Sequence, residues 1–123
     1  MSDEFLDFVE DILDAMDKAE VLVEGFTYRE FEKDFRTNFA VIRALEIIGE
    51  ATKRLPMSVR ERYQEIPWTG MAGMRDRIIH GYDTVDLQIV WDVVKQDIPE
   101  IKPQIQQILA DYLAKGFPVA TAC

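Results

Sequence analysis

Hydrophobic side chains recur every three or four residues along most of the chain, and this spacing limits the fold to one built of helices. Proline and glycine interrupt the pattern in a few places. The Val/Ile/Thr alternation typical of strands is absent, and there is no repeat or low-complexity segment. We therefore predict an all-α fold, an up-and-down bundle of four to five main helices joined by short connections.

The length of 123 residues fits one domain and is enough to bury a core without a metal or a disulfide. Apolar residues make up 48% of the chain, which excludes a disordered protein, and no apolar run reaches the roughly 20 residues of a membrane helix. The chain starts acidic and has one cysteine, Cys123, so we expect a cytoplasmic protein with no secretion signal and no disulfide. We expect the helical domain over residues 1–115 and a C-terminal tail over residues 116–123.

Capping signals and helix breakers divide the chain into its expected helices. The capping boxes Thr27–Glu30 and Ser58–Glu61 each open a short helix, and Pro99 should kink or break the last helical stretch. Methionine and aromatic stripes, including Phe35 and Phe39, are expected in the core. The longer helices are expected at about 3–24, 34–55, 67–80, 87–98 and 101–112.

Acidic residues are concentrated at the start of the chain. The formal net charge is −9, and residues 1–24 alone carry nine acids and one base. Residues 53–82, by contrast, carry six bases and three acids. Binding of phosphates usually needs lysine and arginine, so the overall charge argues against nucleic acid whereas its distribution does not.

The single histidine, His80, excludes several kinds of active site. A histidine-rich zinc site and a di-iron site with two Glu-x-x-His motifs cannot be built from one chain. There is no phosphate-binding glycine loop and no serine nucleophile motif, and Cys123 at the last position would not be held in place. The candidates that remain lie within eight residues of one another: Arg75, Asp76, Arg77, His80 and Tyr82.

Helical geometry predicts which of these side chains meet. Asp76 and His80 are four residues apart, so on a helix the carboxylate would hold the imidazole in one tautomer and favour its protonated form. Arg75 and Tyr82 are seven apart and would share a face. Arg75 and His80 lie about 140° apart on an ideal helix and converge only if the arginine swings across or the helix unwinds near Gly81.

Two interpretations of these polar residues stay open. A histidine near a helix end beside arginine and aspartate is often a surface or capping residue, and perturbed groups also arise in structural networks. Arg43, Glu46 and Glu50 share one side of the helix expected at 34–55. These three residues either form a paired, solvated helix face or position the side chains of the candidate site without contacting the substrate themselves.

The segment with Arg75, His80 and Tyr82 has the pattern Arg-x4-His-x-Tyr and resembles the signature of HepT-like toxins, which belong to the HEPN (higher eukaryotes and prokaryotes nucleotide-binding) superfamily. The spacing alone recurs by chance, but further blocks resemble the family in the same order. The resemblance covers roughly residues 5–112, with no departure at the motif positions. The blocks are Phe8–Leu13, Ala40–Ala51, Ile66–Trp68, Gly73–Arg77 and Val90–Trp91.

The resemblance implies a homodimer with the two motif segments facing each other, and a metal-independent endoribonuclease without a cofactor. It implies a toxin of a type VII-like toxin–antitoxin module with RNA and not DNA as substrate. Arg75 and His80 would be catalytic, with Asp76 and Arg77 in support. The implied antitoxin is similar to MntA, a small nucleotidyltransferase that moves AMP onto the motif tyrosine, which by position is Tyr82.

Two other functions are compatible with the same residues. HEPN-type bundles also serve as non-catalytic nucleotide-binding or partner-docking modules beside nucleotidyltransferases, in which case Arg75 and His80 would hold only a nucleotide phosphate. A helical dimerisation protein with a structural polar motif is the third interpretation. An affinity for AMP without RNA cleavage would favour the second, and a purely structural effect of His80→Ala the third.

Overall fold

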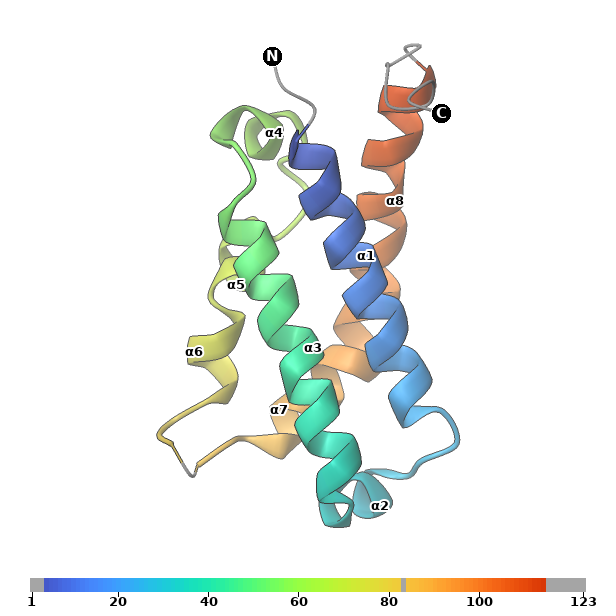
Figure 1. The fold of residues 1–123 in the computed structure, drawn as a ribbon, viewed down its shortest axis with the longest axis vertical. Coiled ribbons are helices and arrows are strands. Elements are labelled where there is room, and N and C mark those ends of the chain that lie inside the picture. Colours follow the sequence, from blue (N-terminus) through green and yellow to red (C-terminus); the bar gives the residue numbers. More distant parts are fainter. Residues whose placement is uncertain (1–3, 83, 115–123) are drawn as a thin grey trace.

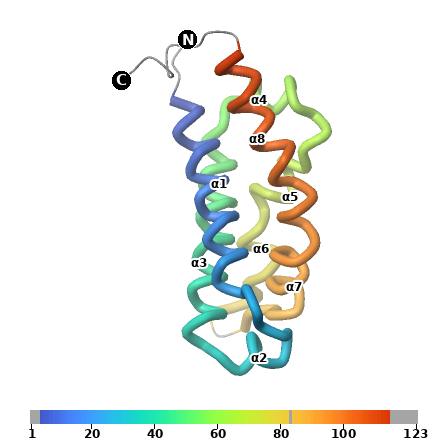
Figure 2. The backbone as a smooth tube through the Cα atoms, turned by 90° about the vertical axis from the view of Figure 1, so that its right-hand side faces the viewer, coloured from blue at the N-terminus to red at the C-terminus, as the bar shows by residue number. Residues whose placement is uncertain are grey.

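Three long helical paths lie side by side in the computed structural model, which describes residues 4–82 and 84–114 (Figure 1). The first two are α1 (Glu4–Val23) and α3 (Phe35–Lys53), which Figure 2 shows packed along each other. The third joins α7 (Leu87–Asp92), a π-helical segment (Val93–Asp97) and α8 (Ile98–Ala114). The prediction of an all-α helical bundle is confirmed.

Short helices complete the bundle at its two ends and along one side: α2 (Tyr28–Lys33), α4 (Met57–Arg62), α5 (Trp68–Ala72) and α6 (Met74–Ile78). The capping box before α2 is present as expected. The Glu30 N–H donates to Thr27 Oγ1 at 3.2 Å, and the Thr27 N–H donates to Glu30 Oε1 at 2.9 Å. Gly25 forms the turn that follows α1. Its φ of 80° is a backbone conformation that is unfavourable for residues with a side chain.

The core lies where the inner faces of the three long paths meet. The 3–4 spacing of α1 turns one apolar side onto α3 and α8, because residues at that spacing share a helix face. Burial of these side chains is the main favourable term for the fold. The largest fully buried side chains of the core include those of Ile12, Met16, Phe31, Leu45, Ile48, Met71, Ile78, Ile98, Ile105 and Ile108.

Two predictions about helix ends, the cap at Ser58 and the break at Pro99, differ from the structure. Ser58 does not cap α4, because Pro56 with its extended ψ of 149° occupies the N-cap and Ser58 lies inside the helix. Pro99 does not break the third path. The disturbance is the π-helical turn immediately before it, where the Ile98 N–H bonds the Val93 carbonyl. The wider π turn leaves room for the ring of a proline, which has no N–H to donate.

The expectation that Phe35 and Phe39 lie in the core is wrong. They are 65% and 69% exposed and form an edge-to-face pair, with ring centroids 6.1 Å apart. The remaining apolar side chains of α3, such as Leu45 and Ile48, already fill the contact with α1. The apolar face of α3 is wider than this contact, so its first two turns present an aromatic pair to solvent.

Gly49 of α3 lies at a close contact between helices. A Cβ at this position would lie 3.2 Å from the Met71 carbonyl oxygen and 3.5 Å from the Met74 side chain. Glycine therefore lets α5 approach α3 closely, and this approach also sets the position of α6. Both short helices bury one methionine each in the core, Met71 and Met74.

No helix in the described part of the chain is long and apolar enough to span a bilayer. The expected tail at 116–123 lies outside the described residues.

The contact at Gly49 predicts the effect of adding one methyl group. Gly49→Ala pushes a Cβ against a backbone oxygen, and the resulting strain should lower the free energy of unfolding by about 1–3 kcal/mol. Gly70→Ala in α5 is the matched control, because a Cβ there meets nothing within 4 Å and alanine favours a helix. Urea denaturation measures both. Equal stability of the two variants would contradict a tight contact at Gly49.

Candidate active site

The motif begins on a very short helix. Gly73 ends α5 and starts α6, and its N–H donates to the Thr69 carbonyl at 3.0 Å. The helix expected over 67–80 is therefore two helices of five residues each. Glycine favours such a break because it is a poor helix former.

The second helix ends at Ile78, earlier than the His80 that we expected. Ile79 is extended, with φ −108° and ψ 117°, and pairs with Val85 in an isolated antiparallel bridge. The Asp86 N–H donates to the Ile78 carbonyl at 2.8 Å. The extended segment that follows the loop therefore supplies a hydrogen-bond donor to a carbonyl at the end of α6. β-branched residues on both sides of the bridge favour this extended pairing.

The early end of α6 overturns two expectations of contact. Asp76 lies in α6 and His80 in the loop beyond it, and no hydrogen bond or ion pair joins them within the described residues. Arg75 and Tyr82 do not share a helix face either, because Tyr82 is outside the helix. Helical spacing applies only as far as the helix continues.

The loop holds His80 by its backbone and leaves its side chain exposed. The His80 N–H donates to the Thr84 carbonyl at 2.8 Å, next to the bridge. Tyr82 lies near the tip of this loop and is fully exposed. The loop therefore presents an imidazole and a phenol to solvent directly after the arginines of α6.

Arg75 leans from α6 towards α3. Its Nε lies 3.8 Å from Glu46 Oε2, and Arg43 Nη1 lies 3.7 Å from Glu46 Oε1, so this carboxylate lies between two guanidinium groups. The Arg75 side chain stays 63% exposed, and such exposed ion pairs contribute little to stability. Arg75 thus remains accessible to an anion, with Glu46 holding its direction. Glu50 does not join this set and instead pairs with Lys53 at 3.6 Å.

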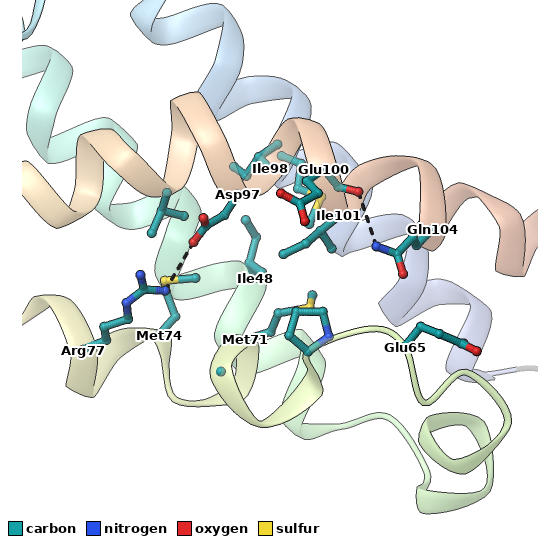
Figure 3. A pocket seen from close by; sticks show the side chains of 14 residues that line it. Ile48, Glu65, Met71, Met74, Arg77, Asp97, Ile98, Glu100, Ile101 and Gln104 are labelled. Atoms are coloured by element: carbon teal, nitrogen blue, oxygen red, sulfur yellow. Dashed lines mark hydrogen bonds and ion pairs between the residues drawn. The ribbon is translucent and has the colours of Figure 1, made fainter.

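Arg77 points to the other side of α6. Its Nη1 lies 3.3 Å from Asp97 Oδ2, an ion pair that connects α6 to the π-helical segment (Figure 3). Arg75 and Arg77 are thus directed to different neighbours, Arg75 to α3 and Arg77 to the π-helical segment. Asp97 is a partner that sequence reasoning missed, because 20 residues separate the two and no local spacing signals the contact.

The arrangement suits phosphate chemistry. A guanidinium group matches the geometry of phosphate oxygens, and an imidazole can donate or accept a proton. Within the described residues, no three histidine, cysteine, aspartate or glutamate side chains come together to hold a metal ion. The exposed aromatic pair of α3 was also missed as a surface feature, since its spacing is that of a core stripe.

Comparisons with known proteins identify the family of this chain. A family model described as "Ribonuclease HepT-like" matches residues 12–108. The chain is 44% identical over 102 residues to "Probable ribonuclease HepT" of Thermococcus cleftensis, covering 83% of this chain and 93% of that protein. It is 43% identical over 108 residues to "Putative RNase MJ1216" of Methanocaldococcus jannaschii, covering 88% and 89%. No solved structure gives a significant match. This chain therefore belongs to the HepT-like ribonuclease family.

Proposed function

We propose that this protein is a metal-independent endoribonuclease, the toxin of a toxin–antitoxin module, and that Arg75 and His80 cleave RNA. The observation that carries the proposal is the loop after α6, which exposes His80 and Tyr82 a few residues beyond an accessible Arg75. The names of the relatives, a probable ribonuclease and a putative RNase, support the same activity. RNA is accordingly the proposed substrate.

The chemistry needs two proton transfers and one stabilising charge. A base takes the proton of the 2′-hydroxyl, whose oxygen attacks phosphorus, and an acid protonates the departing 5′-oxygen. A cation stabilises the charge that builds up on the phosphate oxygens. Arg75 supplies the cation, and His80 supplies one proton-transfer group per chain. Two copies of His80 would supply the base and the acid together.

The need for two such groups makes a homodimer part of the proposal. Phe35 and Phe39 expose a pair of aromatic rings on α3, and a second copy packed on these rings would bury their apolar surface. Glu46, which contacts Arg75, lies on the same side of α3, about three turns along. A second copy packed on the aromatic pair would therefore border the motif. Two-fold packing of identical surfaces is the commonest way for such a chain to dimerise.

Regulation follows from the exposed phenol. A nucleotidyltransferase of the MntA type would transfer AMP to the Tyr82 hydroxyl, forming a phosphodiester and releasing pyrophosphate from ATP. The attached AMP places a bulky anion next to Arg75 and His80, where it repels RNA by charge and by volume. Tyr82 suits this reaction because its side chain is fully accessible.

The role of His80 predicts a clean loss of activity. His80→Ala should lower RNA cleavage at least about 100-fold, because general acid–base catalysis is removed. The melting temperature should not change, since the side chain is exposed and alanine keeps the backbone bond to Thr84. Cleavage of a labelled RNA and a circular-dichroism melt measure the two effects, with Gln106→Ala as an exposed control. Full cleavage by His80→Ala, or none by the wild type, would refute the proposed role.

The proposed dimer predicts the effect of making the aromatic pair polar. The double variant Phe35→Ser/Phe39→Ser should have the mass of one 14.2-kDa chain in light scattering and should lose RNA cleavage. Leu113→Ser is the control, because Leu113 is 53% exposed near the end of α8, at the opposite end of the bundle from the start of α3 (Figure 1). A double variant that keeps the mass of a dimer would show that the chains meet elsewhere.

Tyrosine exposure predicts which residue is modified. After incubation with the cognate nucleotidyltransferase and ATP, peptide mass spectrometry should find AMP on Tyr82. Tyr112 is buried and Tyr28 and Tyr63 are half-buried, so their hydroxyls are less accessible. Tyr82→Phe should abolish the modification and leave the fold intact. AMP found only on one of the other three tyrosines would contradict the assignment.

A further inference from the structure

A cavity of about 390 Å³ opens between α5, α6 and the path from the π-helical segment into α8 (Figure 3). Its apolar floor is formed by Ile48, Met71 and Met74, and Ile98 lies above them. The volume lies in the range of small-molecule sites, which are concave, mostly apolar and provided with a few polar groups. The π-helical segment borders the cavity, and such segments are frequent at functional sites.

The polar side chains of the cavity are almost all hydrogen-bond acceptors. Asp97 and Glu100 contribute carboxylates from the same wall, and Glu65 contributes another at the outer rim. The Gln104 amide nitrogen donates to the Glu100 carbonyl at 3.4 Å, which leaves its side-chain oxygen to accept. Among the described residues that line the cavity, Arg77 is the single charged donor, and Asp97 already binds it at 3.3 Å.

This lining selects the chemistry of a ligand. Carboxylates need donors, and an ammonium group supplies three donors and no acceptor. A floor of methionine and isoleucine favours methylene groups. From this combination, we propose that the cavity is a binding site for an aliphatic polyamine, with its ammonium groups on Asp97 and Glu100 and its methylene chain over Met71 and Ile98. An anionic ligand would instead face the carboxylates of Asp97 and Glu100, with one guanidinium among the described lining residues to offset them.

The position of Asp97 links this site to the motif helix. A ligand ammonium at Asp97 competes with Arg77 for the same carboxylate, because the ion pair already uses it. Arg77 is two residues from Arg75 on α6, so its release adds a mobile positive charge beside the candidate active site. Binding of the polyamine itself does not depend on the proposed ribonuclease activity.

Calorimetry of the full chain with spermidine, in the absence of RNA, tests the site. We expect one bound spermidine per chain and at least about tenfold weaker binding of butylamine, which carries a single ammonium group. Glu100→Gln should weaken spermidine binding about five- to tenfold, as one charged hydrogen bond is lost. Glu61→Gln on α4 makes the same change of charge outside the cavity and should leave the affinity within twofold.

The direction in which Arg77→Gln changes the affinity for spermidine is the decisive test of the site. Removal of the guanidinium group leaves Asp97 unshared, so spermidine should bind about two- to fivefold more tightly, the range expected for exposed ion pairs. Methyl resonances of Ile98, Ile101 and Met71 should shift on titration of wild-type protein with spermidine. No binding heat, or equal weakening by Glu100→Gln and Glu61→Gln, would overturn the site and reduce it to general attraction by an acidic protein. These outcomes are independent of whether the protein cleaves RNA.

Discussion

The close approach of α5 to α3 at Gly49 determines where the motif lies. With the Met71 carbonyl only 3.2 Å from the position of a Cβ, the two helices can sit this close only because the residue has no side chain. The approach buries Met71 and Met74 and places Arg75 within 3.8 Å of Glu46 on α3. A packing constraint in the core therefore sets the direction of an arginine on the surface.

The end of α6 is the second constraint. A helix continued to His80 would have paired it with Asp76, whose carboxylate would favour the protonated imidazole. The chain instead turns at Ile79 into the bridge with Val85, and His80 is held by its backbone alone. Its side chain thereby stays exposed, which leaves it accessible for the proton transfer proposed above.

The acidic side chains of α1 and the candidate RNA-binding residues lie on different parts of the protein. Part of the acidic face of α1 is used within the fold, because Lys102 of α8 binds Asp17 at 2.7 Å and Glu20 at 2.5 Å. These carboxylates raise the pKa of Lys102, so the stabilisation is present at neutral pH and is lost only as the pH rises through that raised value. The acidity of the chain is thus compatible with an RNA-binding surface elsewhere, although it predicts weak and salt-sensitive binding.

The helices could be predicted from local signals, whereas the contacts between them could not. Periodicity placed α1 and α3 to within about two residues, and Thr27 with Glu30 marked the start of α2, because caps and amphipathic faces are encoded by neighbours in the chain. The motif residues Arg75, His80 and Tyr82 could likewise be identified from the sequence. The geometry of the motif could not be predicted, since it depends on backbone bonds between residues four to eight apart around a turn.

The sequence by itself thus determined the helical class, the family and the residues of the candidate site. Only the tertiary structure decided which side chains meet: Glu46 with Arg75, Asp97 with Arg77, and no contact between Asp76 and His80 among the described residues. It also decided that Phe35 and Phe39 face solvent, although their spacing is that of a core stripe. The physical reason is that helix spacing specifies an apolar face, while the neighbours that pack against it determine how much of that face is buried.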